Sequence, residues 1–195
     1  MPCHSNSEDK KSAYNLAKYF GFRMIEFDLT DIYDLYVEKI KKGIKVDDKD
    51  LIDANINLKP RLRTATLYYY ASMLSHIENE TYIVPGTSNA CELYVGYFTK
   101  GGDNISDILV LADLTVDEVI KIGKYIGVPE SIVNKTPNDG LSGMSDEEKL
   151  GVTYKDITKV INKEEVNKDI YKKIKDLHDK NNHKFNTPIY RKKWN

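Results

Sequence analysis

The stretch that decides the fold is "GTSNACELYVGYFTKGGDNISDI", residues 86–108, which directly follows the apolar run "YIVP" at residues 82–85. The apolar run is typical of a strand, because β-branched and aromatic residues favour strands. Polar and charged side chains then gather just past it, namely Thr87, Glu92, Lys100, Asp103 and Asp107. In open α/β sheets, ligands bind at the carboxyl ends of the strands. The stretch therefore predicts an α/β fold with a binding site after this strand.

The bulk composition is that of an ordinary globular chain. The 195 residues carry 29 basic and 30 acidic side chains, a net charge of −1, which gives no general attraction to nucleic acid or anionic membrane. No apolar run is long enough to span a bilayer. Two cysteines, Cys3 and Cys91, are too few for a disulfide framework and favour a reducing compartment. We therefore expect a single cytoplasmic domain over residues 1–195.

Hydrophobic periodicity predicts a helix-rich chain with few strands. Helices are expected over residues 8–20, 31–43, 48–57, 60–77, 90–95, 115–127, 146–151, 154–161 and 164–181. Strands are expected over residues 23–27, 81–85 and 108–111. Pro60 suits the first turn of a helix. Two apolar stripes are expected to face inward, Ile32, Leu35, Tyr36 and Ile40 on one helix and Val119, Ile122 and Ile126 on another. The order of elements predicts a parallel sheet with helices on both faces, short of strands for a complete doubly wound sheet.

Gly86, Thr87 and Glu92 suggest a corner that binds a nucleotide and a metal ion. Glycine-rich turns and helix N-termini offer backbone N–H groups to phosphates. A carboxylate in the same place competes with phosphate unless Mg²⁺ bridges the two, and Mg²⁺ is usually held by one or two carboxylates plus phosphates. The alternative is a solvated glutamate that caps a helix. Lys100 and Asp107 likewise either form a surface ion pair or bind complementary groups of one polar ligand.

Several stretches occur together in a familiar order: "MPCHSNSED", "NLKPRLRTATLYYYA", residues 86–108, "DLTVDEVIKIGKYIGVPE", "KTPNDGLSGMSDEEKLGVTY" and "HKFNTP". They resemble the ammonia-dependent NAD⁺ synthetases of the N-type ATP pyrophosphatase superfamily. The resemblance implies a Rossmann-like fold of the adenine nucleotide alpha hydrolase type. It also implies a ligase of NAD biosynthesis in which ATP activates the nicotinate carboxylate of deamido-NAD⁺ as an acyl-adenylate. Ammonia then displaces AMP, and Mg²⁺ assists.

The same resemblance assigns roles by position. Thr87 and Asn138 match ATP-binding positions, and Glu92 matches a Mg²⁺ ligand. Asp103 matches a loop aspartate whose role stays open. The positions that match deamido-NAD⁺ contacts are Arg61, Lys100, Asp107, His183 and Lys184. No catalytic side-chain nucleophile is implied, because the chemistry needs only positioning and charge stabilisation. The family forms homodimers, so we expect a homodimer that binds small-molecule substrates.

The sequence departs from the family pattern in three places. The S-G-G-x-D-S loop that cradles the ATP phosphates is absent from the 195 residues, so we expect an N-terminally truncated sheet. Val116 stands where the family has a lysine, and Asn138 stands where it has serine or threonine. The alternative is therefore an inactive or split-gene fragment that dimerises or binds dinucleotide only. A different adenylating ammonia-ligase of the superfamily is a third reading, which Lys100, Asp107 and the His183-Lys184 pair argue against.

Overall fold

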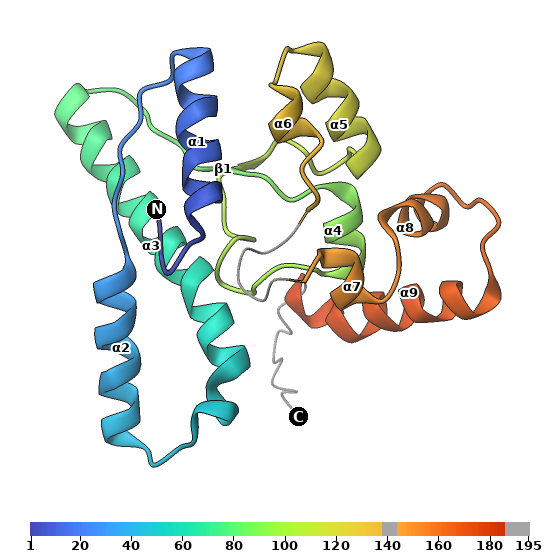
Figure 1. Ribbon diagram of the computed structural model, residues 1–195, viewed down its shortest axis with the longest axis horizontal. Helices are drawn as coiled ribbons and strands as arrows, with labels where there is room; N and C mark the ends of the chain where they lie inside the picture. The colour runs from blue at the N-terminus through green and yellow to red at the C-terminus, as the bar shows by residue number, and fades with distance from the viewer. Residues whose placement is uncertain (138–143, 186–195) are drawn as a thin grey trace, which may run out of the picture.

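The computed structural model describes residues 1–137 and 144–185, and within them the chain is rich in helices (Figure 1). The first half contains α1 (Ser7–Phe20), α2 (Thr30–Gly43), η1 (Asp48–Leu51), α3 (Ile52–Glu78), β1 (Pro85–Gly86) and α4 (Ala90–Val95). The second half contains β2 (Ile108–Leu109), α5 (Val116–Tyr125), α6 (Glu130–Val133), α7 (Asp146–Leu150), α8 (Tyr154–Ile161), α9 (Lys168–Asn181) and η2 (Asn182–Lys184). No helix in these ranges is long and apolar enough to cross a membrane.

The sheet of the described residues consists of β1 and β2, which run parallel with Pro85 opposite Ile108 and Gly86 opposite Leu109. Gly86 allows this close approach, because a Cβ on it would lie 2.6 Å from both Leu109 Cδ2 and Ser106 Oγ, and these side chains would have to move. The chain leading into β2 is fastened to the chain leading into β1. The Asp107 amide donates to the Val84 carbonyl at 2.8 Å, and the Asp107 carboxylate accepts from the Val84 amide at 2.7 Å.

Most predicted helices are confirmed, with ends set by identifiable caps. Gly21 ends α1 in the left-handed conformation, where glycine carries no steric cost. The cap at the start of α1 is the Asn6 side chain rather than Ser7, which is the first helical residue. The two helices expected over residues 48–57 and 60–77 are one 27-residue helix after η1, so Pro60 lies inside α3 and the prediction that it starts a helix is wrong.

The predicted strands are shorter than expected. The strand expected over residues 81–85 is reduced to β1, and the one expected over residues 108–111 is reduced to β2. The strand expected over residues 23–27 is not formed. A strand is defined by its pairing, and residues 23–27 have no neighbouring strand in the described part of the chain. The fold remains an α/β arrangement with a parallel sheet, as predicted.

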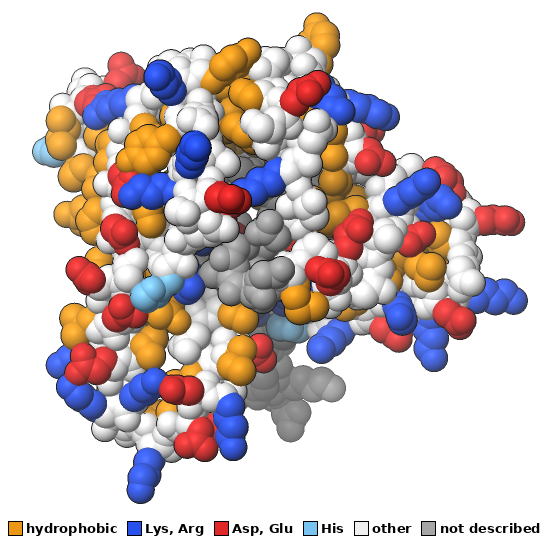
Figure 2. All heavy atoms as spheres, viewed as in Figure 1, with side chains coloured by type: hydrophobic (Ala, Val, Ile, Leu, Met, Phe, Trp, Pro, Cys, Tyr) orange, Lys and Arg blue, Asp and Glu red, His pale blue; other side chains and the backbone are white. Residues whose placement is uncertain are grey.

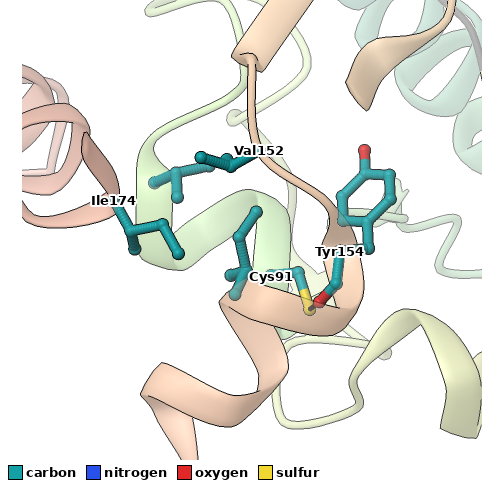
Figure 3. Packing of buried hydrophobic residues seen from close by; sticks show 6 residues of the cluster. Cys91, Val152, Tyr154 and Ile174 are labelled. Atoms are coloured by element: carbon teal, nitrogen blue, oxygen red, sulfur yellow. Dashed lines mark hydrogen bonds between the residues drawn. The ribbon is translucent and has the colours of Figure 1, made fainter. Parts of the chain in front are cut away.

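Two separate clusters of buried side chains hold the molecule together. The larger cluster joins α4, α8 and α9 and contains Cys91, Val95, Val152, Tyr154, Ile157 and Ile174 (Figure 3). The smaller one joins the N-terminal residues to the start of α2 through Cys3, Leu29 and Tyr33. Both cysteines are free and buried. The best-packed part of the described chain is therefore the group formed by α4, α8 and α9.

Helices α1, α2, α3 and α5 leave much of their apolar faces exposed to solvent. α1, α3 and α5 bury none of their residues. The α2 stripe of Ile32, Leu35, Tyr36 and Ile40 is exposed, and so are Ile122 and Ile126, so both stripes were wrongly predicted to face inward. Figure 2 shows hydrophobic side chains spread over the surface of the half built by α1, α2 and α3. Within the described residues, α2 packs against α3, and α5 packs against α6 and α8, so these faces are covered only in part.

Candidate functional site

Past the end of β1, three of the predicted polar residues line one cavity of about 560 Å³. Thr87 follows β1 directly, Asp103 comes from the glycine-rich loop and Lys184 comes from η2. The Asp103 carboxylate is held in place because it accepts the Thr99 amide at 2.9 Å. This end of the cavity offers a hydroxyl, a carboxylate and an ammonium group, whereas Glu92 and Lys100 are not among the residues that line it.

Glu92 lies one turn into α4, behind the loop that carries Thr87. The Asn89 side chain caps the helix, and Glu92 Oε2 accepts the Asn89 amide at 3.0 Å, which completes a capping box. Glu92 therefore caps the helix as the alternative proposed, but it is half-buried and not solvated. Burial raises the pKa of Glu92 to about 7, although the hydrogen bond from Asn89 opposes this, and the charges of Asp146 and Asp103 raise the pKa further.

The acidic surroundings of Glu92 were not found by sequence reasoning. Asp146 is buried at the start of α7, where its two carboxylate oxygens accept the hydroxyls of Tyr97 at 3.0 Å and Tyr154 at 3.2 Å. Burial raises the pKa of the Tyr154 hydroxyl strongly, and the charge of Asp146 adds to this effect. The "DEEKLG" stretch predicted the helix but gave no sign that its first acidic residue turns inward.

A divalent cation would fit this corner, with the Glu92 carboxylate as one of its ligands. A buried carboxylate beside further negative charge is stabilised by a cation, and Mg²⁺ is often held by one protein carboxylate plus phosphate oxygens. Within the described residues, no three or more His, Cys, Asp or Glu side chains lie together so that they could hold a metal ion. Glu92 would then be one protein ligand of the ion, with the other ligands supplied by phosphate oxygens.

The basic residues predicted to bind the dinucleotide form a connected chain. Arg61 on α3 donates through Nε and Nη2 to the Lys100 carbonyl, both at 3.2 Å. The Lys100 ammonium donates to the His183 carbonyl at 2.8 Å. Lys184 donates to the carbonyls of Gly96 at 2.6 Å and Phe98 at 2.9 Å. The structure thus brings Arg61, Lys100, His183 and Lys184 to one side of the loop after α4.

The remaining predicted positions lie elsewhere. Asp107 is engaged between β1 and β2, where its second oxygen also accepts the Tyr68 hydroxyl at 3.3 Å. Val116 is half-buried against the larger core cluster at the start of α5. Asn138 lies outside the described residues. Spacing alone could not separate Asp107 from the residues that line the cavity, because its contacts depend on how α3 crosses the sheet.

A scan of protein families matches residues 1–188 to the family described as NAD synthase. The NH₃-dependent NAD⁺ synthetase of Carboxydothermus hydrogenoformans is 39% identical over 189 residues, which cover 96% of this chain and 74% of that protein. The synthetase of the same description from Methanococcus aeolicus is 39% identical over 85% of this chain and 62% of its own length. The chain thus spans about three quarters of the first relative and less than two thirds of the second.

Comparison with solved structures also finds similar synthetases. The NMN synthetase of Francisella tularensis is similar with a TM-score of 0.85 and 30% identity, over 96% of this chain and 74% of that one. The NH₃-dependent NAD synthetase of Campylobacter jejuni, solved in complex with the nitrate ion, has a TM-score of 0.69 with 22% identity over the same shares, which supports the fold. The match over nearly the whole chain, together with the site after β1, leads to one conclusion: this chain belongs to the NAD synthase family.

Proposed function

We propose that this chain provides the site for the ATP-dependent amidation of deamido-NAD⁺ with ammonia, which yields NAD⁺, AMP and pyrophosphate. Membership of the NAD synthase family carries the proposal. The arrangement of Thr87, Asp103 and Lys184 around one cavity supports it, because these groups suit a polar and charged ligand. The chemistry itself needs no side-chain nucleophile, because positioning and charge stabilisation suffice.

The reaction balances without an oxidant or reductant. A nicotinate carboxylate oxygen attacks the α-phosphorus of ATP, so a new P–O bond forms and pyrophosphate leaves. Ammonia then attacks the acyl carbon with its lone pair, the bond to AMP breaks, and the nitrogen releases one proton to solvent to give the neutral amide. Positioning and stabilisation of phosphate charge account for catalysis of this kind. Mg²⁺ on Glu92 would offset the charge on the phosphates as they separate.

In this proposal each side chain has a limited task. Thr87, at the carboxyl end of β1, donates its hydroxyl to ATP. Arg61 and Lys100 contact deamido-NAD⁺, and His183 with Lys184 closes over the same ligand. Asp107 also faces that ligand in the family pattern, although here its carboxylate already accepts from Val84 and Tyr68.

The test measures NAD⁺ formation by the purified chain with deamido-NAD⁺, ATP, Mg²⁺ and ammonia. Glu92→Gln keeps an acceptor for the capping box and removes the charge. Glu118→Gln is the matched control, because Glu118 occupies the same capping position in α5 and accepts the Thr115 amide at 2.8 Å. We expect turnover to fall about a hundredfold or more in the first variant and to stay unchanged in the second. Binding of deamido-NAD⁺ without turnover in the unaltered chain would instead support the alternative of a binding fragment.

A second substrate is favoured by one observation. The Francisella tularensis structure named an NMN synthetase has a higher TM-score, 0.85, than the Campylobacter jejuni NAD synthetase, 0.69. The same amidation on nicotinate mononucleotide would use the same nicotinate carboxylate and lack only the adenylate half of the dinucleotide. Values of kcat/KM for deamido-NAD⁺ and for nicotinate mononucleotide decide between the two substrates. A higher value for the mononucleotide would make it the proposed substrate in place of deamido-NAD⁺.

We further propose a homodimer in the cytoplasm. The exposed stripe of Ile32, Leu35, Tyr36 and Ile40 on α2 has the spacing of a helix face that packs against a second helix. Both cysteines are free, which is consistent with a reducing compartment. Light scattering during size-exclusion chromatography gives the mass in solution. We expect the dimer mass for the unaltered chain and the monomer mass for Leu35→Glu, and a monomer in both cases would contradict the proposal.

A further inference from the structure

The carboxyl end of α4 obtains part of its hydrogen bonding from α9. A helix leaves its last four carbonyl groups without partners inside the helix. In α4, the Glu92 carbonyl accepts the Tyr97 amide at 2.8 Å. The Leu93 carbonyl accepts the Gly96 amide at 3.2 Å, which is the turn that a left-handed glycine makes at a helix end. The next two carbonyls along the chain therefore depend on donors from outside the helix.

Side chains of α9 supply those two donors. His178 Nδ1 lies 2.7 Å from the Tyr94 carbonyl oxygen, and because a carbonyl only accepts, Nδ1 carries the hydrogen. The Asn181 side-chain amide donates to the Val95 carbonyl at 2.9 Å. Residues three positions apart on a helix share one face, so both donors lie on the face of α9 that packs against α4.

Lys184 continues this row three positions further, in η2. Its ammonium donates to the carbonyls of Gly96 at 2.6 Å and Phe98 at 2.9 Å. It differs from the other two donors in its access to ligand, because Lys184 lines the cavity past β1 whereas His178 and Asn181 do not. The row thus combines two contacts that a ligand in this cavity does not reach with one that it does.

The proposed function requires the contacts of η2 to change when substrate binds. Lys184 reaches deamido-NAD⁺ only by leaving the two carbonyls that it now holds. Lys100 does so only by leaving the His183 carbonyl, to which its ammonium donates at 2.8 Å. Asn181 is the last residue of α9 and directly precedes η2, so its bond to α4 is not disturbed by this exchange.

We propose that Asn181 is a positioning residue of the substrate site, which keeps η2 beside the cavity while Lys184 and Lys100 exchange carbonyls of the chain for the ligand. The inference rests on the proposed function, because it needs a substrate that recruits these two lysines. Asn181 acts through Lys184 and does not touch the ligand. Its loss lowers the fraction of chains in which Lys184 is placed to bind, and the apparent affinity falls by that fraction. The chemical step on bound substrate is unaffected.

The kinetic test compares Asn181→Ala with Asp176→Ala, a matched control at an exposed position of the same helix. We expect the KM for deamido-NAD⁺ to rise about fivefold in Asn181→Ala at constant kcat, the change that loss of one hydrogen bond of ordinary strength produces. Both constants should stay unchanged in Asp176→Ala. A merely structural role would remove active chains, so a lower kcat at constant KM would overturn the proposal. An equal rise of KM in both variants would also overturn it.

A second test needs no substrate. Trypsin cleaves after lysine and must take the lysine side chain into its own pocket, so it cuts after Lys184 only when this side chain has left Gly96 and Phe98. Mass spectrometry gives the rate of this cut. We expect it to rise about fivefold in Asn181→Ala and to stay unchanged in Asp176→Ala.

The cleavage result separates this inference from the amidation. Equal rates in the unaltered chain and in Asn181→Ala would overturn the role of Asn181, whether or not the chain forms NAD⁺. Faster cleavage in Asn181→Ala, in a chain that neither binds nor converts deamido-NAD⁺, would support the placement of Lys184 by Asn181 and refute the proposed substrate.

Discussion

Replacement of Gly96 by alanine tests how α4 is joined to α9. Gly96 ends α4 in the left-handed conformation at φ 69°, and a Cβ on it would lie 2.4 Å from the Asn181 Cβ. Gly151 ends α7 in the same conformation at φ 66°, but a Cβ there would meet nothing within 4 Å. The two glycines therefore share the backbone requirement and differ only in the contact.

The expected cost of each change follows from this difference. An alanine in the left-handed region costs about 1–2 kcal/mol, which applies to both variants. In Gly96→Ala the methyl group also displaces Asn181, whose side-chain amide donates to the Val95 carbonyl at 2.9 Å. Loss of one such hydrogen bond costs about 1 kcal/mol, and the steric strain adds about 1 kcal/mol or more. We expect Gly96→Ala to lower the free energy of unfolding by about 3–4 kcal/mol and Gly151→Ala by about 1–2 kcal/mol.

Urea denaturation followed by circular dichroism measures both variants against the unaltered chain. A change in midpoint with a constant slope indicates a change in stability alone. Equal losses in the two variants would refute the reasoning, because they would mean that the contact between α4 and α9 adds nothing to the cost of the backbone conformation.

Three further changes test the core, the sheet and the acidic corner. Ile174→Ala, at a fully buried position of the larger cluster, is expected to lower the free energy of unfolding by about 2–5 kcal/mol, and a loss below about 1 kcal/mol would contradict the packing seen in Figure 3. Asp107→Ala is expected to lower it by about 1–3 kcal/mol even without ligand, because the Val84 amide loses its acceptor; unchanged stability would return Asp107 to a purely ligand-binding role. The pKa of Glu92, about 7 in the folded chain against an ordinary 4.5, means that the folded chain binds more protons between these pH values, so the free energy of unfolding falls as pH rises through this window. At ~1.4 kcal/mol per pKa unit the fall is at most about 3 kcal/mol, and Glu92→Gln is expected to flatten it in denaturation curves recorded from pH 4.5 to 7.5.

Local signals in the sequence predicted the local parts of this structure. The helices expected over residues 8–20, 90–95, 146–151 and 154–161 all depend on neighbours within a few positions. The strand over residues 23–27 was wrong as a paired strand, since pairing needs a partner that periodicity does not reveal. Pro60 was misplaced because the tertiary contacts of α3 override the preference of proline for a helix start.

The candidate site was predictable to a similar extent. Thr87 and Lys184 were both predicted as site residues, and the structure brings them to one cavity although 97 positions separate them (184 − 87). The burial of Asp146 and the contacts among Arg61, Lys100 and His183 were not predictable from spacing. They depend on how α9 and η2 return to α4, which links residues more than 80 positions apart.

The basic side chains beside the loop after α4 are already bound to the chain's own carbonyl groups. Lys184 is held by Gly96 and Phe98, and Lys100 is held by His183. An anionic substrate that recruits these ammonium groups must compete with those carbonyls, so part of its binding free energy is spent on breaking internal contacts. η2 would then lose its contacts with the loop after α4 at the moment the substrate binds, while Asn181 still holds α9 to the Val95 carbonyl. Affinity and the rigidity of η2 are thereby linked, and tighter recognition of the anion would come with a looser η2.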